Sequence, residues 1–208
     1  MSNVRNTVLS HVKGAESGTL HAFFRGMPRN TTMFNMPILP DQSSHPTLAQ
    51  ECGLQRPGPG WWAWLSDTHA TLALLAAVPV WLALALSVGE YMRYPAGMWA
   101  WASLLLVQPV LEELVFRGIL QGQVLRLMSL NGEPRRLGPV TLANVLVTVG
   151  FVALHLRAQA SGWALAVAGP SLVLGHLRER FGSVWPAMLV HAFYNAGFGL
   201  TAWLVVGL

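Results

Sequence analysis

Three ionisable side chains stand close together in a stretch that is otherwise apolar. Glu112, Glu113 and Arg117 lie within residues 98–127, whose composition would let this stretch cross a lipid bilayer. A charge at the centre of a spanning helix costs about 2.5 to 3.5 kcal/mol, so charges placed there need partners and generally serve a function. The cluster is therefore a candidate functional site, and a neutralised helix-packing device is the alternative.

Helix geometry gives the two glutamates different roles. Glu113 and Arg117 are four residues apart with the acid on the N-terminal side, the favourable arrangement for an ion pair on one helix face. Glu112 is rotated by about 100° from its neighbour. Glu113 is therefore expected to pair with Arg117, which leaves Glu112 available for chemistry.

Two further pairs of residues have the same spacing of four. Phe151 and His155 lie near the end of one apolar run, and His191 and Asn195 lie within the last one. A carboxylate can take a proton from water, a histidine can orient that water, and His and Asn donors can stabilise an oxyanion. Together these residues could hydrolyse a peptide bond without a covalent intermediate. Metal binding by Glu112, His155 and His191 stays open as an alternative, because carboxylate and imidazole are metal ligands.

Signatures of other protease classes are absent from the sequence. It contains no His-Glu-x-x-His zinc motif, no Gly-x-Ser-Gly turn and no Gly-Asp pair of the presenilin type. Ser161 and Ser171 lack the setting of a nucleophile and are expected to be helix-end or packing residues. Cys52 has no neighbouring base, and as the only cysteine it cannot form an intramolecular disulfide.

Composition points to an integral membrane protein of a single domain. Hydrophobic residues make up 53% of the 208 residues and charged residues only 11%, and the mean hydropathy is +0.44. The net charge of +4 arises from basic residues that fall mostly between apolar runs, as expected on the cytoplasmic side of a membrane. A nucleic-acid partner is not expected.

The pattern along the chain predicts an all-α, polytopic bundle of about five spanning helices. Residues 1–60, polar and rich in proline, are expected to form a flexible cytoplasmic tail in which His11, His21 and His45 are solvated. Residues 61–208 are expected to form the transmembrane domain, with tryptophans at 61, 62 and 64 at the headgroup level. The apolar runs are 71–88, 97–127, 139–156, 162–177 and 184–206.

Proline and charge refine this bundle. Pro109 is expected to kink the second run, and breaks are expected at Gly169-Pro170 and at Trp185-Pro186. Arginines are more numerous in the second and fourth connections than in the first and third, so the N-terminus is predicted in the cytoplasm and the C-terminus outside.

The three motifs together resemble those of the CAAX-protease and bacteriocin-processing family. They are Glu-Glu-x-x-x-Arg, Phe-x-x-x-His and His-x-x-x-Asn, and they occur here in that order. The flanking segments Phe116 to Gly118 and Gly182 to Ala187 are similar to the family as well. The resemblance covers about Trp99 to Ala196, and the three motifs in combination are highly specific.

The resemblance implies a glutamic-type intramembrane endopeptidase. No metal or other cofactor is expected, because no two candidate ligands show the helical spacing of a zinc motif and Glu112 alone could activate the water. Glu112 would be the general base on water, His155 its partner, and His191 with Asn195 the donors on the oxyanion side. Glu113, Arg117 and Phe151 would support the site.

The implied substrate is a membrane-anchored protein or peptide, with CAAX-like processing or removal of a C-terminal sorting signal as the reaction. The implied location is the plasma membrane of a prokaryote. The rival interpretation is a non-hydrolytic membrane protein, such as a bacteriocin self-immunity or scaffold factor, that keeps the motifs as a packed polar core.

Overall fold

The computed structural model describes residues 47–207 with gaps at 131 and 133, and it describes residue 90 without its side chain. The first long helix, α4, spans Thr68–Val88. It begins three residues before the expected apolar run because the Asp67 carboxylate accepts hydrogen bonds from the backbone N–H groups of His69 and Ala70. Its 21 residues extend about 31 Å, enough to cross a bilayer.

The second apolar run forms one helical segment that contains two stretches of wider π turns. Its parts are α5 (Met98–Ala102), η4 (Ser103–Val107), α6 (Gln108–Glu113), η5 (Leu114–Leu120) and α7 (Gln121–Ser129). Pro109 has no N–H to donate to the preceding turn, so a regular α-helix is interrupted there. The kink expected at Pro109 thus corresponds to widened turns, which lie on both sides of Glu112 and Glu113.

A short hairpin precedes the third long helix. β1 (Arg136–Leu137) pairs antiparallel with β2 (Val140–Thr141), so the described part of the chain is all-α apart from this hairpin. The Thr141 side chain then accepts a hydrogen bond from the Asn144 backbone N–H and caps α8 (Leu142–His155). The helix therefore begins three residues later than the apolar run at 139 indicates.

The expected breaks are helix boundaries. α9 (Ser161–Ala166) and α10 (Ala168–Phe181) are separated at Val167, so Pro170 lies in the first turn of α10, where proline is tolerated. Gly182, with φ of 61°, ends α10 in the left-handed conformation that favours glycine. Pro186 lies in the first turn of α11 (Trp185–Val206), so it starts this helix and does not break it.

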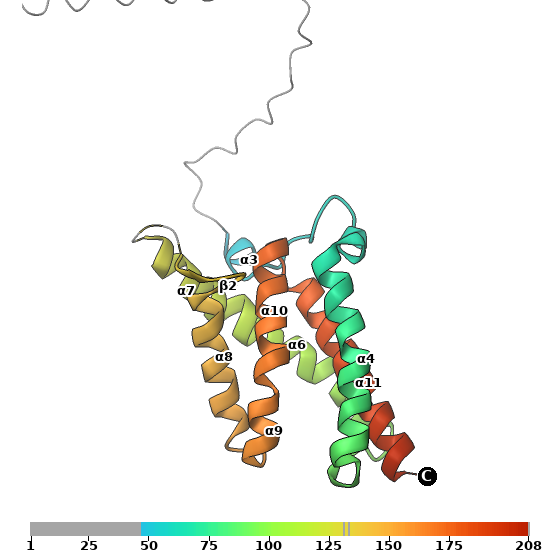
Figure 1. Cartoon of the computed structure of the whole chain (residues 1–208). Coiled ribbons are helices and arrows are strands. Elements are labelled where there is room, and N and C mark those ends of the chain that lie inside the picture. Colours follow the sequence, from blue (N-terminus) through green and yellow to red (C-terminus); the bar gives the residue numbers. More distant parts are fainter. Residues whose placement is uncertain (1–46, 131, 133, 208) are drawn as a thin grey trace, which may run out of the picture. The chain divides into compact units, whose positions relative to one another are not determined.

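The helices pack around α10 and α11, as Figure 1 shows. α11 contacts α4, α10 and α6, and α10 contacts α8. Trp64, expected at the headgroup level, is buried in the main apolar cluster and packs edge-on against Phe181. Trp61 and Trp62 are exposed. The cluster consists of Trp64, Ala70, Ala73, Leu174, Leu177, Ala187 and Val190.

The end of the expected flexible tail is packed against the helices. Residues 47–56, which include α3 (Leu48–Glu51), form a strap across the ends of α7 and α10. Glu51 pairs with Arg126 at 2.5 Å, and the Val184 N–H donates to the carbonyl of Gly53 at 2.9 Å. The short turns η2 (Ala63–Ser66) and η3 (Gly89–Tyr91) flank α4. Residues 1–46 of the tail, which include its three histidines, lie outside the described residues.

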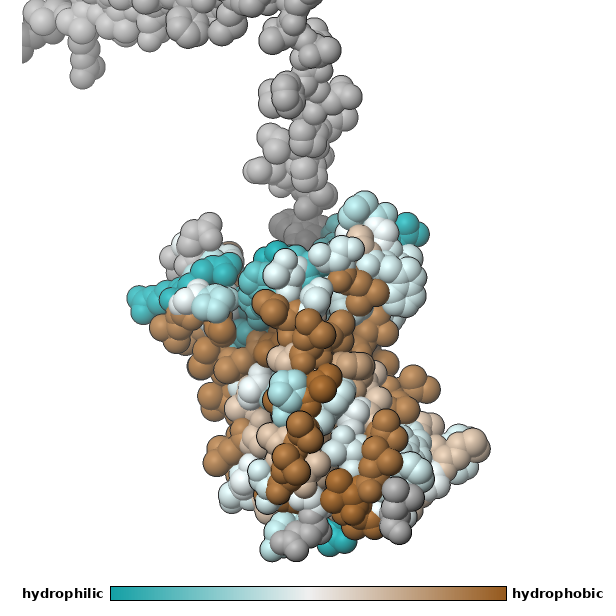
Figure 2. Space-filling view, turned by 45° about the vertical axis from the view of Figure 1, so that its right-hand side comes forward, coloured by the Kyte–Doolittle hydropathy of each residue, from teal (hydrophilic) through white to brown (hydrophobic). Residues whose placement is uncertain are grey.

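Two helices in the described part of the chain are long and apolar enough to cross a membrane by themselves. They are α4, with a mean hydropathy of 2.2, and α11, with 1.4. α8 is apolar but shorter, and the second run is divided by its π turns. Figure 2 shows hydrophilic residues gathered at one end of the molecule, with much apolar surface over the rest of this face.

Candidate functional site

A buried ion pair lies at the centre of the site. Arg117 Nε is 3.2 Å from Glu113 Oε2, and the two side chains are 1% and 0% exposed. This is the pair expected from their spacing of four residues on one helix. Two charges buried together stabilise each other, whereas either one alone would be strongly destabilising.

His191 connects the fifth apolar run to this pair. Its Nδ1 lies 2.8 Å from Glu113 Oε1, so the same carboxylate contacts Arg117 through one oxygen and His191 through the other. A carboxylate only accepts hydrogen bonds when ionised, so His191 donates through Nδ1. This contact fixes the imidazole ring so that Nε2 faces Glu112.

Glu112 has a different environment from its neighbour. Its side chain is 28% exposed, and its Oε2 lies 3.8 Å from His191 Nε2. That distance is too long for a direct hydrogen bond but suits two groups that contact the same water molecule. Glu112 is thus the carboxylate of the pair that a reactant can reach.

Phe151 and His155 approach from α8. The Arg117 guanidinium carbon lies 4.7 Å from the centre of the Phe151 ring, a cation–π contact, and Phe116 packs edge-on against the same ring. His155 packs against Phe151 with 4.3 Å between ring centres and the rings tilted by 43°, and it is close enough to Glu112 to interact with it electrostatically. Its Nδ1 donates to the Phe151 carbonyl at 2.9 Å, which leaves Nε2 as the free acceptor of the neutral ring.

Asn195 hydrogen-bonds the backbone of another helical turn and not Glu112 or Glu113. Its Nδ2 donates to the carbonyl of Leu104 at 2.9 Å, within the π turns of η4. One N–H of the amide is used in this bond, and the second stays available as a donor. The structure therefore brings Glu112, Glu113, Arg117 and His191 together, places Phe151 and His155 beside them, and ties Asn195 to the helix backbone one turn along α11.

Ser171 is a contact of the site that the sequence did not reveal. It was expected to be a helix-end or packing residue, but its hydroxyl and carbonyl both accept hydrogen bonds from Arg117, at 2.8 and 3.2 Å. Thr148 lies 2.9 Å from the Ser171 hydroxyl. Neither residue stands at a fixed spacing from a charged residue in the sequence, so no local signal could have identified them. Ser161 does lie at a helix end, as expected.

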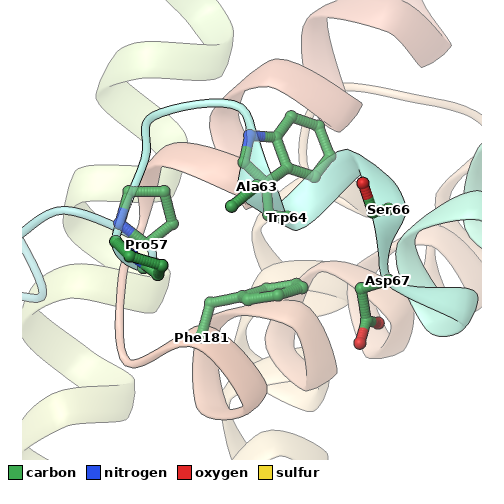
Figure 3. Close-up of a pocket in the computed structure, with 8 residues that line it drawn as sticks. Pro57, Ala63, Trp64, Ser66, Asp67 and Phe181 are labelled. Carbon is green, nitrogen blue, oxygen red and sulfur yellow. The ribbon is translucent and has the colours of Figure 1, made fainter.

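A surface hollow lies away from this cluster. It measures about 310 Å³ and is drawn in Figure 3. Trp64 and Phe181 form its apolar walls, and the Asp67 carboxylate at its edge is bound by both Nε and an Nη of Arg180. None of the predicted site residues lines it, so the position of the chemistry rests on the polar cluster and not on cavity size.

Candidate metal ligands do not gather in the described residues. No group of three or more His, Cys, Asp or Glu side chains there has an arrangement suited to a metal ion. The absence of a metal requirement therefore stays a prediction.

Comparison with known proteins gives a match over the region of the chain that contains this polar cluster. The sequence profile described as type II CAAX prenyl endopeptidase Rce1-like matches residues 94–197, half of the chain. No curated protein and no solved structure gives a significant match. The matched residues include the whole polar cluster and agree with the extent of the motif resemblance. The chain therefore belongs to the type II CAAX prenyl endopeptidase Rce1-like family, a family of integral-membrane proteases.

Proposed function

We propose that this protein is a glutamic-type intramembrane endopeptidase in which Glu112 activates water for attack on a peptide bond. The observation that carries the proposal is the contrast between the two glutamates. Glu113 is fully buried and uses both oxygens on Arg117 and His191, whereas Glu112 is partly exposed and faces His191 Nε2 at 3.8 Å. A packed polar core needs the first arrangement and has no use for the second.

The proposed reaction follows from these positions. Glu112 removes a proton from water, and the hydroxide attacks the carbonyl carbon of the scissile bond. The resulting oxyanion is stabilised by His191, with Nε2 protonated, and by the free N–H of Asn195. Glu112 then returns its proton to the leaving amine, and the carbon–nitrogen bond breaks. His155, with its free Nε2, helps to orient the water.

The proposed substrate is a membrane-anchored protein or peptide cleaved near the membrane surface, either at a CAAX-like C-terminus or at a C-terminal sorting signal. The family membership and the apolar surface of α4 and α11 support a membrane location. We further propose a multi-pass protein of a prokaryotic plasma membrane with about five spans, in which the helix of residues 98–129, α8, and α9 with α10 add three spans to these two helices.

Replacement of the proposed base tests the mechanism. Purified protein in lipid vesicles is incubated with prenylated CAAX peptides and with unprenylated sorting-signal peptides, and the products are identified by mass spectrometry. Glu112→Gln should lower the cleavage rate at least about a hundredfold, the usual scale of general-base catalysis. Glu51→Gln is the matched control, because it makes the same change outside the polar cluster. Full activity in Glu112→Gln would require another base.

Chelation tests the expected independence from metal. Because water activation by Glu112 needs no Lewis acid, wild-type cleavage should persist after exhaustive dialysis against a strong chelator. Loss of cleavage, with recovery on addition of zinc, would favour metal binding by Glu112, His155 and His191. If the folded wild-type protein cleaves neither class of peptide, the immunity or scaffold interpretation becomes the better one.

A further inference from the structure

We propose that Ser171 and Thr148 are positioning residues, which hold Arg117 so that Glu113 presents His191 to Glu112. The expected loss of activity rests on the proposed function, whereas the expected change in the orientation of His191 rests on geometry alone. Both residues are buried, at 1% and 6% exposure, and they come from two helices, α10 and α8, that carry neither Glu112 nor Glu113.

The hydrogen bonds of these residues run in one direction. Ser171 Oγ accepts from an Nη of Arg117 at 2.8 Å, since a guanidinium only donates. Thr148 Oγ1 donates to the amide oxygen of Asn144 at 3.4 Å, so the single proton of Ser171 is the one shared with Thr148 at 2.9 Å. The order is therefore Arg117 to Ser171 to Thr148 to Asn144, and each hydroxyl both accepts and donates.

Asn144, the last residue of this series, is held by a hydrogen bond to a backbone carbonyl. Asn144 Nδ2 donates to the Leu172 carbonyl at 2.9 Å, which determines which way the amide faces and leaves its oxygen toward Thr148. The amide fits only because residue 175 is glycine, since a Cβ there would lie 2.1 Å from Asn144 Oδ1. The Arg117 guanidinium is thus anchored to the contact of α8 with α10 through these side chains, and the Ser171 carbonyl accepts from the same nitrogen at 3.2 Å.

The anchored guanidinium determines how Glu113 is used. With one Nη held by Ser171 and a face on Phe151, Arg117 directs Nε at Glu113 Oε2. Glu113 Oε1 is then left to accept from His191 Nδ1, and His191 Nε2 faces Glu112. Without the bond to the Ser171 hydroxyl, only the Ser171 carbonyl holds this nitrogen. The guanidinium can then turn and engage both oxygens of Glu113, and His191 loses its fixed orientation.

The positioning role of Ser171 and Thr148 is tested by removing their hydroxyl groups in the full-length protein in lipid nanodiscs. Thr148→Val removes the hydroxyl and keeps the shape, Thr148→Ser keeps the hydroxyl, and Ser171→Ala removes the other hydroxyl from α10. Thr71→Val is the matched control on exposed α4. Thr148→Val and Ser171→Ala should lower kcat about tenfold to a hundredfold with little change in KM. Ser171→Ala loses a hydrogen bond to the charged Arg117, and Thr148→Val loses the hydrogen bond that holds the Ser171 hydroxyl in place. Thr148→Ser should stay near wild type.

A second measurement does not depend on activity. In ¹⁵N-histidine spectra, with the His191 signals assigned by a His191→Gln variant, the wild-type protein should show a protonated Nδ1. This signature should be altered in Thr148→Val and in Ser171→Ala and kept in Thr71→Val. An unchanged signature in folded hydroxyl-deleted variants overturns the inference. If the wild-type protein cleaves no peptide, the proposed function fails, and the spectra still decide the positioning role.

Discussion

Adjacent glutamates in this protein have opposite environments. Glu113 points into the bundle, where Arg117 and His191 use both of its oxygens, while Glu112 is directed about 100° away and keeps 28% of its side-chain surface exposed. The same residue type can therefore stabilise the fold at one position and be available for proton transfer at the next.

Removal of the Glu113 charge should cost more stability than removal of the Glu112 charge. Glu113→Gln leaves Arg117 buried without a counter-charge, so the free energy of unfolding should fall by about 3 kcal/mol or more. Denaturation in mixed micelles measures this cost, with Glu112→Gln as the comparison variant. Equal stability of the two variants would mean that Arg117 has no need of Glu113.

At the scale of elements, interruptions of regular helix lie close to the site. π turns precede and follow the glutamates, and the carbonyl of Leu104 in the first of them accepts the Asn195 hydrogen bond. α4 is positioned differently, by a charged cap. Asp67 accepts from two backbone N–H groups at its start and pairs with Arg180 of α10 at 2.7 Å.

The Asp67 pair gives α4 a dependence on pH. The hydrogen bond from Arg180, followed by those from the backbone, lowers the pKa of Asp67 from 3.8 to about 2. Because the folded-state pKa is the lower one, the unfolded chain binds more protons between these values, and the stability that the pair provides is lost as pH falls from about 4 to about 2. The melting temperature of the wild-type protein should therefore decline across this range.

Two substitutions of Asp67 separate the effect of its charge on stability from the effect of its helix cap. Asp67→Asn keeps a capping side chain without the charge, so its melting temperature should change less than that of the wild type between pH 4 and 2. Asp67→Ala also loses the cap and should be about 1 kcal/mol less stable than Asp67→Asn at neutral pH. The same acid response in Asp67→Asn and in the wild type would assign that response to other carboxylates.

At the scale of the whole molecule, arginines gather at the end that carries the strap. Arg126 pairs with Glu51, Arg136 lies in the hairpin, and Arg178 donates to the Glu51 carbonyl. Positively charged segments stay in the cytoplasm, so this end is expected to face the cytoplasm.

Cysteine labelling should locate the opening of the site. In a Cys52→Ser background, cysteines are placed near the two histidines, at Leu156 and Leu189, and Ser66→Cys and Gln159→Cys serve as controls for the two ends. We expect the site to open toward the cytoplasm, so membrane-impermeant reagent should label the Leu189 position only in inside-out vesicles. Labelling of both histidine-flanking positions only from outside would reverse this assignment.

Within single helices, the sequence by itself determined which side chains of the candidate site contact each other. The period of 3.6 residues puts Glu113 with Arg117 and Phe151 with His155, and these contacts are present because such geometry is local. The same motifs identified the family that the profile match confirms. Helix boundaries were less certain, since caps such as Asp67 and Thr141 move an end by three residues without changing hydropathy.

Contacts between helices were decided only by the tertiary structure. His191 is 78 residues from Glu113, and Ser171 is 54 residues from Arg117, so no sequence spacing relates them. Packing, the π turns and glycine at position 175 decide which turn of α10 or α11 faces the helical segment that carries Glu113 and Arg117. A hydroxyl in an apolar helix has the same sequence signal whether or not it binds an arginine, because its partner lies on another element.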